Sequence, residues 1–149
     1  MTDRLLFALK QSLLPCLLLI SLSPLPAQVL SVSAARSRAE GSLVTVRGVV
    51  TNGPELGRIR YLQDATGGIA AFPGNGSMPG FETAVKTGDS VELTGKLVTF
   101  NNLLEISPVT AYQVISSGQA LPPSAQVGLG DIREPLEGRL VTIPCATFE

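Results

Sequence analysis

Histidine and tryptophan are absent from the 149 residues, and only two cysteines are present. Without histidine, Ser–His–Asp and Cys–His nucleophile systems, His-ligated zinc and HExxH proteases are all excluded. Two cysteines are too few for a four-thiolate metal site. Charged residues make up only 15% of the chain and apolar ones 44%, with 15 glycines and 11 prolines. That composition is typical of a turn-rich, strand-rich globular protein rather than of a disordered chain, a coiled coil or a collagen.

Residues 1–27 have the pattern of a secretory signal peptide. Arg4 and Lys10 charge the start, residues 13–22 are almost wholly apolar, and two prolines precede a cleavage site after Ala27. The alternative is an uncleaved membrane anchor, but an apolar run of about ten residues is short of the roughly 20 that a spanning helix needs. We therefore expect a protein that is secreted, or held at the cell surface or in the periplasm, with no membrane attachment after cleavage.

The two cysteines bear on whether the protein is a lipoprotein and whether it contains a disulfide. Cys16 lies inside the apolar run rather than after it, which argues against a lipoprotein signal. After cleavage Cys145 has no partner for an internal disulfide, unless a second cysteine follows residue 149. Removing Arg4, Lys10 and Asp3 leaves nine basic and eleven acidic residues, a net charge of −2.

Beyond a weak helical period in residues 28–42, the apolar residues alternate with a period of two. Five strands are expected, at residues 43–51, 57–63, 69–72, 90–98 and 103–115. Five short antiparallel strands leave two exposed edges, which closure into a barrel removes. The connection between the third and fourth expected strands is the longest, as in the OB-fold. The expected fold class is therefore all-β, a small five-stranded OB-fold-like barrel with a short N-terminal helix, and a small sandwich is the alternative.

A heptapeptide recurs 97 residues along the chain. EGSLVTV at 40–46 returns as EGRLVTI at 137–143, with five of seven positions identical and one Val/Ile exchange. Chance similarity between two strands is the alternative, but a domain-sized period indicates the start of a second similar unit, truncated at residue 149. The expected organisation is a signal peptide at 1–27, a lead-in with a short helix at 28–42, the barrel at 43–116, a linker at 117–128 and the incomplete second repeat at 129–149.

Three runs carry a resemblance to a known module type: VTVRGVVTN at 44–52, YLQDATGGIAAF at 61–72 and KTGDSVELTGKLVTFNNLLEI at 86–106. They resemble the OB-fold modules of secreted bacterial proteins, of the kind found upstream of extracellular nuclease domains (endonuclease/exonuclease/phosphatase) and lamin-tail domains. The resemblance implies a non-catalytic binding or spacer module that works with downstream domains of its own polypeptide. The alternative is the N-terminal part of an extracellular nuclease or phosphoesterase whose catalytic domain lies beyond residue 149.

OB barrels bind ligands across their second and third strands and between the loops that follow strands one and four. Aromatic, basic and amide side chains suited to a ligand occur in these regions: Arg58, Arg60, Tyr61, Phe72, Phe100, Asn101 and Asn102. Cations beside a flat ring suit single-stranded nucleic acid or another polyanion. In the alternative, the rings are core and the arginines are ordinary strand charges. Residues 44–115 hold five basic and six acidic residues, which disfavours tight phosphate binding.

Two aspartates beside glycine turns invite a metal-site or acid–base interpretation. Asp64 and Asp89 occupy positions where aspartate accepts turn N–H groups, and no second carboxylate is close in sequence. We therefore expect no metal, no cofactor and no enzymatic activity within these residues.

Overall fold

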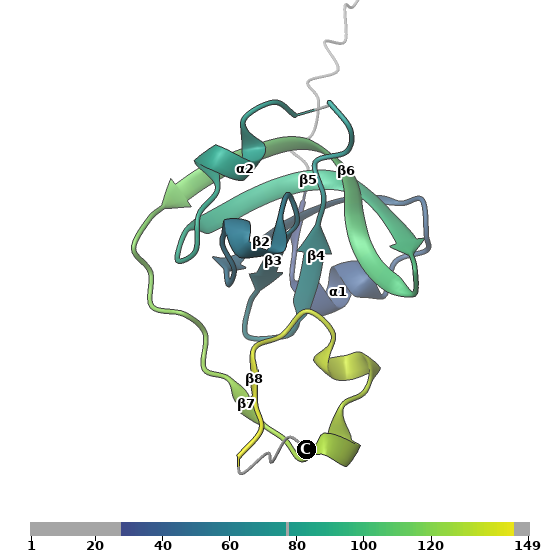
Figure 1. Cartoon of the computed structure of the whole chain (residues 1–149). Coiled ribbons are helices and arrows are strands. Elements are labelled where there is room, and N and C mark those ends of the chain that lie inside the picture. The colour runs from purple at the N-terminus through teal and green to yellow at the C-terminus, as the bar shows by residue number, and fades with distance from the viewer. Residues whose placement is uncertain (1–27, 77, 145–149) are drawn as a thin grey trace, which may run out of the picture.

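The computed structural model describes residues 28–76 and 78–144 (Figure 1). The expected signal peptide and Cys145 lie outside the described residues. In chain order the elements are β1 (Val29–Leu30), α1 (Val32–Arg36), β2 (Leu43–Val50), the 3-10 helix η1 (Pro54–Leu56), β3 (Arg60–Gln63), β4 (Gly68–Ala71), α2 (Phe81–Ala84), β5 (Ser90–Phe100), β6 (Leu103–Ser116), β7 (Ala125–Gln126), η2 (Leu129–Asp131), η3 (Glu134–Leu136) and β8 (Val141–Thr142).

Five strands close into a ring. β2 pairs antiparallel with β3, β3 with β4, and β5 with β6, while β4 pairs parallel with β6 and β2 closes the ring against β5. This connectivity, with one parallel pair and the longest connection between the third and fourth ring strands, is that of the OB-fold. The expected all-β barrel is confirmed, and the alternative of a small sandwich is not what forms.

The two long strands β5 and β6 bend around the barrel and so belong to both of its halves (Figure 1). Their register shifts on both sides of Gly95. A Cβ at Gly95 would press against the Ile106 side chain and the Pro108 carbonyl oxygen. Glycine therefore permits the close approach at which β5 turns the corner of the barrel.

The core fills the ring with the inward side chains of the strands, and a short helix lies on either side of it. Val32 and Ala35 of α1 and Phe81 of α2 are fully buried in this core, and Figure 1 shows the two helices on opposite sides of the barrel. The Ser31 hydroxyl accepts the Ala34 N–H at 3.3 Å, which caps α1. The expected short N-terminal helix is thus confirmed.

The second barrel strand is shorter than expected. Residues 57–63 have a strand pattern, but β3 begins only at Arg60. Pro54–Leu56 forms a 3-10 turn, and Gly57 follows it with a φ of 70°, in the left-handed region. Arg58 therefore lies in a loop rather than on the strand expected at 57–63.

The C-terminal segment, residues 117–144, lies against one end of the barrel (Figure 1) and repeats a feature of its N-terminal lead-in. β1 pairs parallel with β2, with Val29 opposite Thr45. β7 pairs parallel with β8, with Gln126 opposite Thr142, and both residues lie 97 positions further on. The expected linker at 117–128 therefore contains a strand.

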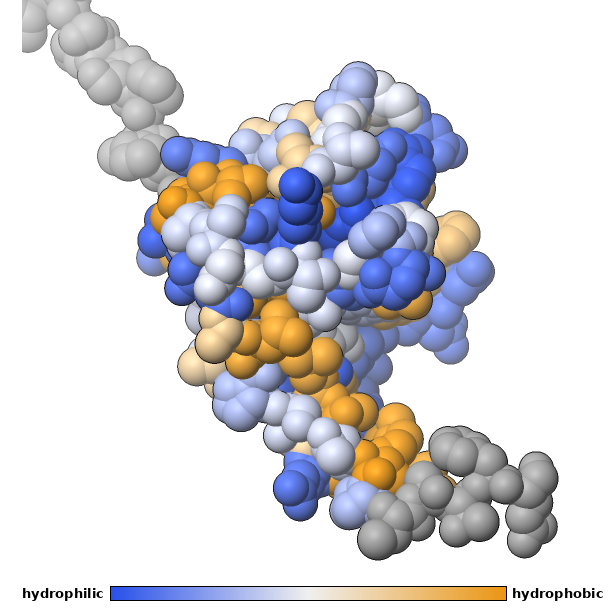
Figure 2. Space-filling model, turned by 60° about the vertical axis from the view of Figure 1, so that its left-hand side comes forward, coloured by the Kyte–Doolittle hydropathy of each residue, from blue (hydrophilic) through white to orange (hydrophobic). Residues whose placement is uncertain are grey.

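The repeated positions differ in their burial. In the first unit, Val32, Ala35 and Val44 are at most 2% exposed. Their counterparts 97 residues later are 66%, 57% and 38% exposed: Leu129, Ile132 and Val141. Figure 2 shows apolar surface of this kind over the C-terminal segment. The segment thus repeats the apolar positions of the first unit, but the described residues do not bury them.

Candidate ligand-binding cleft

A cleft of 880 Å³ opens on the barrel between the β2–β3 loop and the β5–β6 turn. Its walls come from residues 56–59, from 72–75 after β4, from the β5–β6 turn and from the first part of β6. This is where OB-folds bind their ligands. The volume is within the range of small-molecule and cofactor sites.

Arg58 and Phe72 form one wall of the cleft. The Arg58 guanidinium carbon lies 5.6 Å from the centre of the Phe72 ring, a cation–π contact. Arg58 Nε is 3.5 Å from Glu82 Oε1, an ion pair in which both side chains are about one-third exposed. The Arg58 charge is therefore partly neutralised while its planar group stays beside the aromatic ring.

The β5–β6 turn forms the opposite wall. Asn101 and Asn102 have φ values of 49° and 63°, the left-handed conformation that two-residue hairpin turns require and that asparagine tolerates. The turn places Phe100 at the edge of the cleft with 62% of its surface exposed. Asn101 lines the cleft beside it, whereas Asn102 does not.

Glu105 brings a carboxyl group into a cleft that is otherwise largely apolar. It lies on β6, lines the cleft and is 6% exposed. Burial raises the pKa of Glu105 above its usual value. Its only hint in the sequence is a carboxylate inside the apolar run LLEI, and the sequence interpretation missed it. The cleft thus holds one cation, already paired, and one carboxyl group that resists ionisation.

Arg60 does not belong to the cleft. It is fully buried and donates from Nε to the Val85 carbonyl at 3.0 Å and from Nη1 to the Gly57 carbonyl at 2.9 Å. Further bonds reach the Gly53, Ile59 and Glu82 carbonyls. Burial lowers the pKa of Arg60, against the opposing effect of Glu55 and Glu82. Arg60 therefore ties the β2–β3 loop and α2 to β3 and does not line the cleft.

Tyr61 lines a second cavity of 270 Å³, which the barrel forms with residues 137–140. Burial raises the pKa of Tyr61, as do the Glu137 and Glu105 carboxylates.

The structure brings four of the seven sequence-predicted residues together in the cleft: Arg58, Phe72, Phe100 and Asn101. Leu56 and Leu103, which the sequence did not single out, line both cavities.

The two turn aspartates are bound to backbone amides. Asp64 Oδ1 accepts the Thr66 and Gly67 N–H groups at 2.7 and 2.9 Å, and its Oδ2 accepts the Val32 N–H at 2.9 Å. Burial alone would raise the pKa of Asp64, but a hydrogen bond from the Thr66 hydroxyl at 2.6 Å and these three backbone bonds outweigh it, and the pKa is lowered. Asp89 Oδ2 accepts the Lys86 N–H at 2.9 Å in the same manner.

Within the described ranges, no three His, Cys, Asp or Glu side chains gather into a group that could hold a metal ion. Nor does any helix in that part of the chain have the length and apolar character to cross a membrane.

No family model matches the chain. A similar curated protein is endonuclease YhcR of Bacillus subtilis, 30% identical over 132 residues. That match covers 81% of this chain but only 10% of the endonuclease, so the chain spans about a tenth of that protein's length. The chain is thus distantly similar to part of a nuclease, which supports the expected resemblance in that respect. The link to lamin-tail domains stays a prediction.

Two solved structures are similar. The hypothetical protein ygiW from E. coli is 25% identical with a TM-score of 0.46, over 60% of this chain and 91% of that one. Entamoeba histolytica asparaginyl-tRNA synthetase in complex with asparaginyl-adenylate is 21% identical with a TM-score of 0.46, over 62% of this chain and 24% of that one.

Proposed function

We propose that this chain is a non-catalytic OB-fold binding module of a secreted nuclease-type polypeptide, and that its cleft holds single-stranded nucleic acid. The observation that carries the proposal is the cleft itself, with phenyl rings on two walls, Phe72 and Phe100. Every base has a flat face, and stacking on an aromatic side chain contributes about 1–3 kcal/mol per base. The similarity to part of a nuclease supports this choice of ligand.

The charges of the cleft define the mode of binding. Arg58 is its one cation within the described residues, and Glu82 already pairs with it. Binding therefore depends on stacking more than on phosphate neutralisation. The logarithm of the binding constant then falls only shallowly with the logarithm of salt concentration, with a slope of about −0.7 for each neutralised phosphate of a single strand.

The test is a titration of residues 28–149 with a fluorescently labelled oligothymidylate at low and moderate salt. Phe100→Ala is expected to weaken binding by about 5- to 150-fold, the equivalent of one lost stacking contact. Leu43→Ala is the matched control, because Leu43 is 63% exposed against 62% for Phe100 and does not line the cleft. No binding at low salt, or equal effects of the two substitutions, would overturn the proposal in favour of a plain spacer module.

Secretion is part of the same proposal and rests on the pattern of residues 1–27. If the signal is cleaved after Ala27, the protein recovered from the medium or periplasm of an expressing bacterium begins at Gln28. N-terminal sequencing of that protein checks this. An intact Met1 on membrane-bound protein would contradict it.

A second candidate function is that of the front part of an extracellular nuclease or phosphoesterase. The match to a tenth of an endonuclease favours it. The repeated β1–β2 and β7–β8 registers, with their exposed apolar counterparts, support a second similar unit before any catalytic domain. Sequencing the gene past codon 149 is the test. Coding sequence for a metal-binding catalytic core is expected, and a stop codon at once in an intact gene would reject it.

A further inference from the structure

The cleft and the second cavity adjoin each other. Leu56 and Leu103 line both, so the two hollows meet at these side chains. The second cavity has Tyr61 on its barrel side, and residues 137–140 of the C-terminal segment close its other side. The C-terminal segment therefore extends the hollow surface that begins in the cleft.

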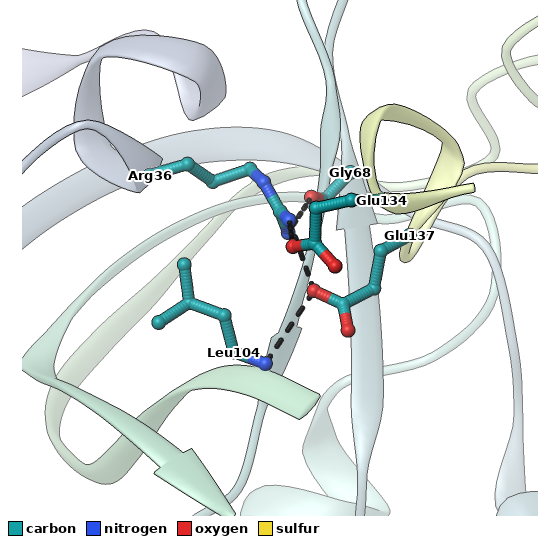
Figure 3. A network of polar contacts seen from close by, with 5 residues as sticks. All are labelled: Arg36, Gly68, Leu104, Glu134 and Glu137. Carbon is teal, nitrogen blue, oxygen red and sulfur yellow. Dashed lines mark hydrogen bonds and ion pairs between the residues drawn. The ribbon is translucent and has the colours of Figure 1, made fainter. Parts of the chain in front are cut away.

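The C-terminal segment is held at this place by specific polar contacts. Arg36 Nη2 lies 2.7 Å from Glu134 Oε1 and 2.9 Å from Glu137 Oε2, and its Nη1 donates to the Gly68 carbonyl at 3.2 Å (Figure 3). The Leu140 N–H donates to Gln63 Oε1 at 2.8 Å. Contacts on α1, β3 and β4 together fix residues 137–140 relative to the barrel.

A close backbone contact adds to this attachment. A Cβ on Gly68 would overlap the carbonyl group of Gly138, so only glycine lets the two chains approach this closely. Gly68 has no positive φ, and alanine fits its own backbone conformation. The contact with Gly138 can thus be broken by adding one methyl group.

The second cavity has one cation among the residues that line it, Arg139. Glu137, which lines the same cavity, is 17% exposed and pairs with Arg36, and Arg36 also pairs with Glu134. Among the described residues Arg139 forms no ion pair, and its Nε is buried without a hydrogen-bond partner. The cleft offers rings and a paired cation, and the adjoining cavity offers an uncompensated one.

We propose that residues 137–140 complete the ligand site, with bases on Phe72 and Phe100 in the cleft and a backbone phosphate at Arg139. This rests on the proposed function and specifies its ligand, a strand of several nucleotides rather than a mononucleotide. Site sizes of about 4–16 nucleotides are usual for an OB-fold. The nucleic-acid strand would run past Leu56 and Leu103, where the cleft and the second cavity adjoin.

The first test compares oligothymidylates of about 3 and about 12 nucleotides. Arg139→Ala is expected to weaken binding of the longer strand by about tenfold, the usual loss for a charge-assisted hydrogen bond. It is also expected to reduce the salt slope by about 0.7 and to leave the shorter strand unaffected. Arg133→Ala is the matched control, because Arg133 is 69% exposed on the same segment and lines neither cavity.

The second test displaces the segment. Gly68→Ala is expected to raise hydrogen exchange at residues 138–142 and to weaken only the longer strand. Gly130→Ala, whose added Cβ meets nothing within 4 Å, is expected to do neither. If Arg139→Ala and Gly68→Ala both bind the longer strand as the unsubstituted chain does while Phe100→Ala does not, this proposal is overturned and the proposed function stands. If the unsubstituted chain binds neither strand, both are overturned.

Discussion

Replacing Arg60 with methionine is expected to destabilise the barrel, because Arg60 ties the β2–β3 loop and α2 to β3. Arg60 is fully buried, and its guanidinium group donates to five backbone carbonyls: Gly53, Gly57, Ile59, Glu82 and Val85. Methionine has a similar length and fills irregular space, so the substitution removes the donors with little loss of volume.

The magnitude follows from the carbonyls left behind. Two of the five bonds, those to Gly53 and Val85, are fully buried. The Gly53 carbonyl also accepts a hydrogen bond from Asn52 Nδ2 at 3.1 Å and keeps that partner, so the Val85 carbonyl is the buried acceptor left unpaired. A buried acceptor left unpaired costs about 1–3 kcal/mol, and the three partly buried carbonyls can turn to water. The expected loss is therefore about 1–3 kcal/mol, a substantial part of the roughly 5–15 kcal/mol that stabilises a typical domain. Arg60→Lys is expected to lose nearly as much, because an ammonium group cannot reproduce the planar fork.

Urea unfolding followed by far-UV circular dichroism measures this loss. With an m-value of about 1.5 kcal/mol/M, the midpoint is expected to fall by about 0.7–2 M. Arg58→Ala is the control two positions away, and its exposed ion pair predicts a change within about 1 kcal/mol. A loss below about 1 kcal/mol for Arg60→Met would refute this account of the residue.

Three further predictions concern other buried or repeated positions. Asp64→Asn is expected to cost about 1–2 kcal/mol of stability, because it loses an acceptor for the Val32 N–H. It is also expected to remove a stabilisation that is complete above pH 3.8 and is lost as the pH falls through the lowered pKa of the folded state. Denaturation at several pH values checks both effects. The pKa of Glu105 is raised in the folded state, so the ionised carboxylate destabilises the protein. Stability should therefore fall as the pH rises from 4.5 through the pKa of the folded state. Glu105→Gln should flatten that pH dependence in the same assay. Val44→Ala is expected to cost about 2 kcal/mol and its counterpart Val141→Ala much less, as thermal melts would show; equal losses would contradict the burial difference.

The barrel could be predicted from the sequence because its strands follow simple rules. Strand β5 alternates apolar and polar residues, and the turn residues asparagine and glycine lie where the chain reverses. The position of the cleft could also be expected, since closing five strands in this order brings the β2–β3 loop and the β5–β6 turn to one side. In the strands and in these turns, the local sequence pattern and the overall fold favour the same conformation.

The roles of Arg58 and Arg60 could not be assigned from the sequence. A strict period of two places both arginines on one face of the strand, but each face carries polar and apolar residues, so the pattern does not show which face is buried. The 3-10 turn at Pro54–Leu56 and the left-handed Gly57 delay the start of β3, and this delay turns Arg58 outward and Arg60 inward. The irregular β2–β3 loop determines which way the two arginines point, and its geometry depends on tertiary hydrogen bonds that no local sequence pattern predicts.

The C-terminal segment shows how the same short sequence behaves in two settings. In the first unit the β1–β2 pair lies within a six-stranded sheet, and Val44 is buried in the core. In the second, β7 and β8 pair in the same register as a sheet of two strands, and an isolated two-stranded sheet is at best marginally stable. The segment therefore depends for its order on the first barrel, through the Arg36 contacts with Glu134 and Glu137 that Figure 3 shows. Because those contacts hold residues 137–140 beside the cleft, whatever strengthens the attachment of the segment also completes the extended site proposed for the ligand.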